Sequence, residues 1–350
     1  MAAGYTRERT GEGFVAVRLS RRGRLERRRI VRFPEAPYAG AVDLVLTRGG
    51  RLLLAGVALD ELGAGRVALA GLRPTLAPDP AFGVAGRALG PPVHHTLDVK
   101  AMALDRAGRI VVASTIGYPT CMQVARFLPD GSPDGSFGTE GSWTSPRGIA
   151  ARALATTRRG EVLVAGRAVR RRGRRSAFVL ARLSVRGSLR SLDVRRLGRG
   201  VGSSSPVTVL ARRDGSAWVV GSVLERRGRR SQVLLRYGRR ARLRRVHRLA
   251  RPRSGFVPVA LVRRPGGRLL LGGLTSDWER WRFYGLTRNG RYDPRVGELT
   301  SRRLARDGLP LLRDFAVRGR RIVGVGTDED DQRLDYFSYL IVTALRITRR

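Results

Sequence analysis

Cysteine is almost absent from this sequence of 350 residues, with Cys121 as the single copy. One cysteine cannot form an intrachain disulfide or a multi-cysteine zinc or iron–sulfur site. Histidine is also scarce, with His94, His95 and His247 as the three copies. Adjacent residues such as His94 and His95 rarely point at one ion, so a surface loop is expected there. We therefore expect no metal and no other cofactor.

Long apolar runs are missing as well. None approaches the roughly 20 residues that a membrane-spanning helix needs. Residues 1–8 lack the apolar stretch of a secretory signal. The hydrophobic content of 42% still supports a buried core. We expect a folded monomer without a transmembrane segment.

Acidic residues are few: the chain has 28 Asp and Glu compared with 69 Lys and Arg, which gives a net charge of +41. Lys100 is the single lysine, so arginine supplies 68 of the 69 basic residues. An excess of this size predicts an anionic polymer or an acidic protein surface as partner, and non-specific nucleic-acid binding in vitro. Aromatic residues make up only 6% of the chain, which argues against sequence-specific reading of nucleic acid by stacking.

One pattern recurs six times along the chain: an alternating strand, a tight turn with glycine, and a second apolar strand. Its turn glycines repeat with a period of about 54 residues. They are Gly50, Gly108, Gly160, Gly215, Gly267 and Gly319. Glycine suits such turns because they need positive φ. Second hairpins, such as those starting at Met122 and Phe178, lie between these copies, so each repeat predicts four short strands.

Strands such as 52–55 and 162–165 are apolar on both faces, as expected for a strand between two neighbouring sheets. A four-stranded repeat of this kind cannot bury both faces alone. Radial stacking of the sheets solves this problem, and the resulting architecture is a β-propeller. The period-two patterns and the boundary glycines and prolines exclude a helical solenoid.

The stretch 125–141, ARFLPDGSPDGSFGTEG, resembles the signature of the delta-60, DUF5122-type repeat. A partial second copy is Asp79-Pro-Ala-Phe-Gly-Val-Ala-Gly86, and the other repeats are degenerate. The resemblance implies a β-propeller, often on exported bacterial proteins, and brings no catalytic residues. It favours an extracytoplasmic location, although the compartment itself stays open.

The repeat count predicts a six-bladed propeller of four-stranded blades in one domain, 14–350, after an N-terminal tail, 1–13. Residues 29–33 are expected to complete the last blade beside the C-terminal strands. One strand is left over in this count, and seven blades is the alternative.

Loops between the second and third strands of each blade should gather on one face and carry its charge. Anion-binding candidates on these loops are Arg170, Arg171, Arg172, Arg174, Arg175, Arg226, Arg227, Arg229 and Arg230. Guanidinium groups can bind phosphate or carboxylate through paired hydrogen bonds. An opposing acidic patch is expected from Asp60, Glu61, Asp328, Glu329, Asp330 and Asp331. Trp278 and Trp281 are candidates for an aromatic platform, with a role in covering their loop as the alternative.

These features favour a non-catalytic binding scaffold with an arginine-rich loop face. The sequence carries no G-x-S-x-G, H-E-x-x-H or phosphate-loop motif. Two alternatives stay open. One is a propeller hydrolase or lyase with a site at the central channel, and the other is a structural module of a bacterial surface protein.

Overall fold

A computed structural model gives the architecture of the chain. It describes residues 2–8, 11–20, 24–93, 97–118, 120–169, 176–197, 201–225, 230–249, 256–275, 280–296, 298–301, 309–318, 321–329 and 339–346. The chain divides into two compact units, which are described one at a time. The first comprises Met1–Arg196, Ala211–Ser216 and Arg239–Arg242, and the second Leu197–Leu210, Ala217–Gly238 and Leu243–Arg350.

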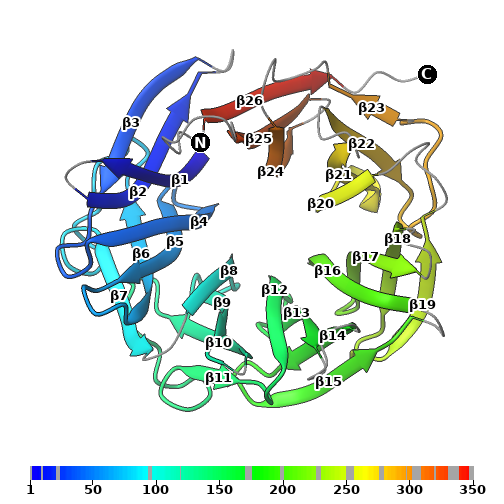
Figure 1. The fold of residues 1–350 in the computed structure, drawn as a ribbon, viewed down its shortest axis with the longest axis horizontal. Helices are drawn as coiled ribbons and strands as arrows, with labels where there is room; N and C mark the ends of the chain where they lie inside the picture. The colour runs from blue at the N-terminus through cyan, green and yellow to red at the C-terminus, as the bar shows by residue number, and fades with distance from the viewer. Residues whose placement is uncertain are drawn as a thin grey trace. The chain divides into compact units, whose positions relative to one another are not determined.

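The fold is all-β and propeller-like, as the sequence predicts, and the regular structure described is strand apart from a 3-10 turn at Pro265–Gly267. Figure 1 shows the strands grouped into small antiparallel sheets in chain order. The described residues form five four-stranded and two three-stranded sheets, and neighbours in each sheet are consecutive in sequence. Consecutive pairing follows from the short turns, because a tight turn brings each strand beside the one before it.

The first unit contains four of these sheets. Its three-stranded sheet consists of β1 (Ala2–Glu8), β2 (Gly11–Leu19) and β3 (Leu25–Val31). The next sheet consists of β4 (Tyr38–Leu46), β5 (Leu52–Leu59), β6 (Gly65–Leu72) and β7 (Arg87–Val93). A third consists of β8 (Leu97–Leu104), β9 (Ile110–Ile116), β10 (Cys121–Phe127) and β11 (Ser142–Thr144). The fourth consists of β12 (Ile149–Thr156), β13 (Val162–Val169), β14 (Ser176–Leu183) and β15 (Leu189–Arg195).

The second unit contains most of the remaining three sheets. One consists of β16 (Val201–Ala211), β17 (Ala217–Glu225), β18 (Arg230–Tyr237) and β19 (Leu243–Arg248). Another consists of β20 (Phe256–Arg263), β21 (Leu269–Thr275), β22 (Trp281–Leu286) and β23 (Glu298–Thr300). The three-stranded sheet consists of β24 (Leu309–Arg318), β25 (Arg321–Glu329) and β26 (Tyr339–Arg346).

The predicted repeat is confirmed, because each of its six copies opens one sheet, at β4, β8, β12, β16, β20 and β24. The turn glycines adopt positive φ wherever the structure describes them, for example 83° at Gly50 and 82° at Gly108. A register shift recurs in the first strand pair, for example between Ala151 and Ala153. This recurring bulge shows that the copies share backbone geometry where their side chains differ.

The N-terminal prediction needs correction. Residues 29–33 do not complete the last blade, because Arg29 and Ile30 lie in β3, which pairs with β2. The expected tail holds strand β1, paired with β2 from Ala2 opposite Val17 to Glu8 opposite Gly11. The N-terminal strands thus form a three-stranded sheet of their own, in the order β1-β2-β3. Sequence reasoning missed β1 because its residues, AAGYTRE, show no apolar alternation.

Two kinds of connection join the third strand of a sheet to the fourth. In the β4–β7, β8–β11 and β20–β23 sheets, here called signature sheets, the chain makes a compact loop with isolated bridges, such as Phe127 to Pro133. In the β1–β3, β12–β15 and β16–β19 sheets, here called hairpin sheets, a tight turn leads directly into the last strand. In the three-stranded β1–β3 sheet, this turn joins the second strand, β2, to the third strand, β3.

Buried apolar side chains link successive sheets within each unit. In the first unit, one cluster joins β5 and β6 to β9 and β10 through residues such as Leu53, Leu69, Val112 and Phe127. In the second unit, Phe283 of β22 packs edge-on against Phe315 of β24, with ring centroids 5.0 Å apart. Both faces of the inner strands are therefore covered, which explains their continuous apolar sequences.

The signature loops also fix the contact between neighbouring sheets. The Gly83 N–H donates to the Asp130 carbonyl at 2.7 Å, and the Gly138 N–H donates to the Arg186 carbonyl at 2.8 Å. Gly131 has a φ of 93°, and an added Cβ would lie 2.8 Å from Cζ of Phe82. The Phe-Gly loop of one sheet thus sits on the glycine turn of the next, which is possible only because that turn carries no side chain.

Candidate anion-binding surface

The predicted arginine loops lie almost entirely outside the described residues. Those outside are Arg170, Arg171, Arg172, Arg174, Arg175, Arg226, Arg227 and Arg229. Arg230, which the structure does describe, begins β18 and is exposed to solvent. The loop arginines therefore remain a prediction.

The predicted acidic patch is described in part. Asp60 and Glu61 form the turn between β5 and β6, where the Asp60 carboxylate accepts the N–H groups of Leu62 at 3.0 Å and Ala64 at 2.8 Å. Asp60 thus stabilises its own turn. The backbone of Asp328 and Glu329 ends β25, whereas Asp330 and Asp331 lie outside the described residues.

The predicted aromatic platform is wrong for Trp281. This side chain is fully buried in the core that contains Phe283 and Phe315, because its position on β22 faces the next sheet. Trp278, like His94 and His95, lies outside the described residues. Cys121 begins strand β10 and is partly exposed.

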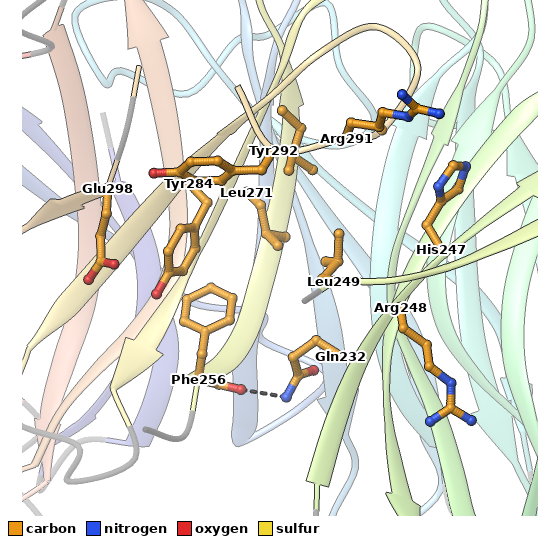
Figure 2. A pocket seen from close by; sticks show the side chains of 12 residues that line it. Gln232, His247, Arg248, Leu249, Phe256, Leu271, Tyr284, Arg291, Tyr292 and Glu298 are labelled. Atoms are coloured by element: carbon orange, nitrogen blue, oxygen red, sulfur yellow. Dashed lines mark hydrogen bonds between the residues drawn. The ribbon is translucent and has the colours of Figure 1, made fainter. Parts of the chain in front are cut away.

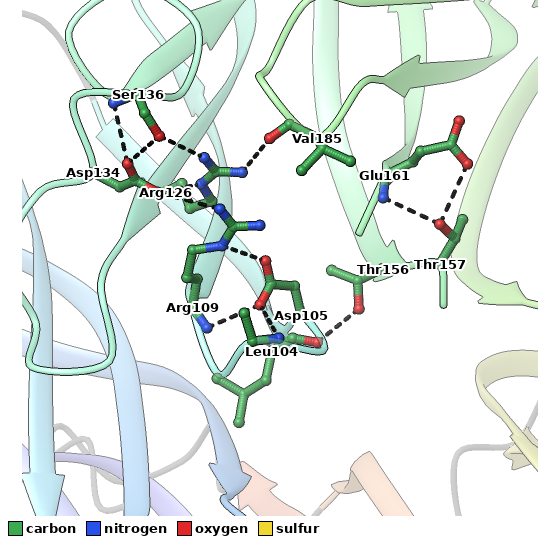
Figure 3. Close-up of polar contacts among 11 residues, drawn as sticks. Leu104, Asp105, Arg109, Arg126, Asp134, Ser136, Thr156, Thr157, Glu161 and Val185 are labelled. Carbon is green, nitrogen blue, oxygen red and sulfur yellow. Dashed lines mark hydrogen bonds and ion pairs between the residues drawn. The ribbon is translucent and has the colours of Figure 1, made fainter. Parts of the chain in front are cut away.

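Some arginines are interior structural elements, and Arg126 in the signature loop shows this best (Figure 3). Its side chain is 1% exposed, and its Nε lies 2.7 Å from the Asp134 carboxylate. The guanidinium also donates to Ser136 Oγ at 3.1 Å and to the Val185 carbonyl in the next sheet. It stacks over the Phe137 ring at 4.5 Å. Arg126 therefore has no free face for a ligand.

Asp134 organises the same loop. Its carboxylate accepts the Ser136 N–H at 3.1 Å and the Ser136 hydroxyl at 2.6 Å. Burial by itself would raise the pKa of Asp134, but the hydrogen bonds from Ser136 and the charge of Arg126 outweigh it and lower the pKa. The carboxylate is thus charged at neutral pH and fixes both the turn and the arginine.

Other arginines in neighbouring sheets also pair with an acid and donate to a carbonyl in the next sheet. Arg51 pairs with Asp79 at 2.5 Å and donates to the Pro129 carbonyl at 2.9 Å. Arg182 pairs with Glu161 and donates to the Gly215 carbonyl at 2.9 Å. Some of the many arginines therefore form contacts within the fold.

A second group of arginines is exposed on the last strands of the hairpin sheets. Strands β3, β15 and β19 each lie at the edge of a sheet, and together they carry eight arginines and two acidic residues. These edge-strand arginines are Arg27, Arg28, Arg29, Arg190, Arg195, Arg244, Arg245 and Arg248, and all are exposed. Charged residues on edge strands also prevent unwanted pairing with other sheets.

The acidic residues on these strands offset little of this charge. Glu26 pairs with Arg18 at 2.9 Å, and Asp193 pairs with Arg195 at 2.9 Å. Exposed pairs of this kind are weak and leave the guanidinium accessible to other anions. Each of the two units thus carries at least one strand with a dense positive charge.

Sequence reasoning concentrated on the loops and missed these strands. A signal was present, because the segments LERRRIV, LRSLDVR and LRRVHR follow directly after tight turns in corresponding repeats. The positions alone do not separate exposed arginine from interior arginine such as Arg126 and Arg182.

Comparison with known families supports the repeat assignment. The model of the family described as "Domain of unknown function (DUF5122) beta-propeller" matches residues 108–137. This stretch is a DUF5122-type propeller repeat. It spans β9, β10 and the start of the signature loop, including Arg126, Asp134 and Phe137. No curated protein matches the chain.

Solved structures show the same fold at low identity. A protein of unknown function from Dyadobacter fermentans is 12% identical with a TM-score of 0.55, and the match covers 89% of this chain and 95% of that one. The Hadza microbial sialidase Hz136 is 10% identical with a TM-score of 0.51, over 82% and 67% of the two chains. A Trypanosoma rangeli sialidase is 10% identical with a TM-score of 0.52, over 97% and 58%. At such identities the likeness extends to the fold alone.

The described part of the chain contains no group of three or more His, Cys, Asp or Glu arranged to hold a metal ion. Within the same residues, no helix has the length and hydropathy required to cross a membrane.

Proposed function

We propose that this chain is a non-catalytic β-propeller scaffold that binds an anionic polymer through its edge-strand arginines. The observation that carries the proposal is the concentration of eight exposed arginines against two acids on β3, β15 and β19. The net charge of +41 supports it, since long-range attraction brings polyanions to such a surface. Interior arginines such as Arg126 contribute to this field but not to contacts.

The chemistry of guanidinium defines the ligand class. Arginine donates paired hydrogen bonds to sulfate, phosphate or carboxylate groups and remains charged at every physiological pH. Binding that depends on many such contacts releases counterions and weakens steeply with salt. A sulfated or phosphorylated polymer therefore fits better than a neutral one.

Heparin retention tests the proposal. We expect the protein to bind heparin at low salt and to elute earlier when Arg27, Arg28 and Arg29 of β3 are all changed to Gln. A matched control changes three exposed turn arginines, Arg106, Arg158 and Arg213, to Gln, which removes the same charge from other positions. Lack of retention at low salt would overturn the proposal. An equal shift in both triple variants would show that net charge, and not the edge strands, governs binding.

A further inference from the structure

A cavity of about 380 Å³ lies between the β16–β19 and β20–β23 sheets of the second unit. Figure 2 shows its two sides, with His247, Arg248 and Arg291 on one and Phe256, Tyr284, Tyr292 and Glu298 on the other. The volume falls in the range of pockets that hold small organic ligands, roughly 300–1,000 Å³. Its lining includes Gly290, Arg291 and Tyr292 from the signature loop between β22 and β23, and Arg248 from the edge strand β19.

The aromatic side of the cavity is rigid. Phe256 and Tyr284 pack edge-to-face, with centroids 5.0 Å apart at 90°, and Tyr292 lies 6.5 Å from Tyr284. Burial raises the pKa of Tyr284 to about 12, so its hydroxyl stays protonated and neutral. The leucines at 249, 271 and 286 complete an apolar floor. A flat apolar group can therefore pack against this wall, because none of the aromatic and leucine side chains that form it carries a charge.

The opposite side carries positive charge. Burial lowers the pKa of His247, and the nearby charges of Arg245, Arg291 and Arg236 lower it further. These arginines come from β18, β19 and the turn before β23, so positive potential reaches the imidazole from three elements. Arg248 on the rim forms an ion pair with Glu225.

The carboxylate on the cavity wall already has an ion-pair partner. Glu298 is the acid among the described lining residues, and its carboxylate lies 2.9 Å from Nε of Arg282. The Gln232 amide donates to the Phe256 carbonyl and accepts from Ser222 Oγ at 2.7 Å. A sugar-like ligand would thus find few free hydrogen-bonding groups, whereas an anion would find Arg291 and His247.

We infer that this cavity binds a small organic anion with a planar apolar body, its anionic group facing Arg291 and His247 and its ring system lying against Tyr284 and Phe256. The inference goes beyond the proposed function, because it concerns a pocket and a small ligand. Arg291, His247 and the aromatic wall are not among the edge-strand arginines.

Two fluorescent probes of nearly equal shape test it: anilinonaphthalene sulfonate, which is anionic, and N-phenylnaphthylamine, which is neutral. We expect Arg291→Gln to weaken sulfonate binding about tenfold, the size of one lost charge-assisted hydrogen bond, and to leave the neutral probe unchanged. Arg288→Gln, an exposed arginine in the same turn, is the matched control and should affect neither probe.

The pocket itself is tested by Leu249→Trp, which fills the cavity and should reduce binding of both probes. The sulfonate should also bind more tightly at pH 6 than at pH 8, because an anion favours protonated His247, and His247→Gln should remove this dependence. The inference is overturned if neither probe binds, if Leu249→Trp leaves binding unchanged, or if Arg291→Gln and Arg288→Gln weaken sulfonate binding equally. The heparin variants change residues that do not line this cavity, so the heparin result can succeed or fail independently of this one.

Discussion

The third strand of a signature sheet and the last strand of a hairpin sheet place arginine in opposite environments. In the β8–β11 signature sheet, Arg126 is 1% exposed and locked to Asp134. In the β12–β15 hairpin sheet, the last strand carries Arg195 with 49% of its side chain exposed, beside Asp193. Both are arginine–aspartate pairs with distances below 3 Å. The comparison teaches that an arginine supports the fold when it lies on a strand that the next sheet covers, and faces solvent when it lies on an edge strand.

The residue that precedes the second strand also differs in charge between the two kinds of sheet. The residue that precedes the second strand is Arg51, Arg109 or Arg268 in the signature sheets, and each contacts the aspartate of its loop. In the β12–β15 hairpin sheet that residue is Glu161, which pairs with Arg182 instead. In this sheet the charged residue before the second strand is therefore an acid that pairs with Arg182, where the signature sheets have an arginine that contacts the loop aspartate.

The largest expected effect comes from removing the carboxylate in the signature loop. Asp134→Ala leaves Arg126 buried without its counter-charge and removes the acceptor for Ser136. Breaking a buried ion pair costs about 3–5 kcal/mol of unfolding free energy. Asp193→Ala breaks the exposed pair with Arg195 and should cost less than about 1 kcal/mol.

Urea unfolding of the two variants measures this difference directly. Asp134→Asn serves as a control, since it keeps an acceptor for the Ser136 N–H but removes the charge. Similar losses in Asp134→Ala and Asp193→Ala would contradict the division into interior and exposed arginines.

A second test uses two glycines in identical Asp-Gly-Ser contexts. Gly131→Ala requires a Cβ at a φ of 93° and only 2.8 Å from Phe82, so it should destabilise the protein by about 1–3 kcal/mol. Gly135→Ala meets nothing within 4 Å and should be close to neutral. Thermal unfolding of both variants gives the comparison, and equal midpoints would rule out the proposed contact between sheets.

The smallest expected effect is on acid stability. Asp79 and Asp134 both have a lowered pKa in the folded protein: hydrogen bonds within the loop and the charges of Arg51 and Arg126, respectively, outweigh the opposing effect of burial. Their stabilisation is present above the pKa of an unfolded aspartate, about 3.9, and is lost as pH falls through the lower folded value.

Unfolding free energy measured between pH 5 and pH 3 should therefore fall less steeply in the double variant Asp79→Asn, Asp134→Asn. Asp193→Asn is the control from a hairpin sheet. An unchanged slope in the double variant would show that these carboxylates do not couple folding to protons.

Much of the fold is predictable from local sequence. Tight turns need positive φ, so the glycines mark the hairpins, and apolar strands between them indicate sheets covered on both faces. The N-terminal strand β1 was not predictable in this way, because its residues show no period-two pattern and its pairing with β2 depends on the sheet already present. Trp281 was misjudged for a related reason: its burial depends on Phe315, which lies in the following sheet.

The sequence by itself determined the repeat, its strand order and the large positive charge, because these depend on residue types and spacing along the chain. Only the tertiary structure decided which arginines are interior and which are exposed. Arg126 and Arg182 lie in short apolar strands and become buried when the next sheet supplies a carbonyl and covers them. Edge strands such as β19 have no strand beyond them, so the same residue type remains in solvent.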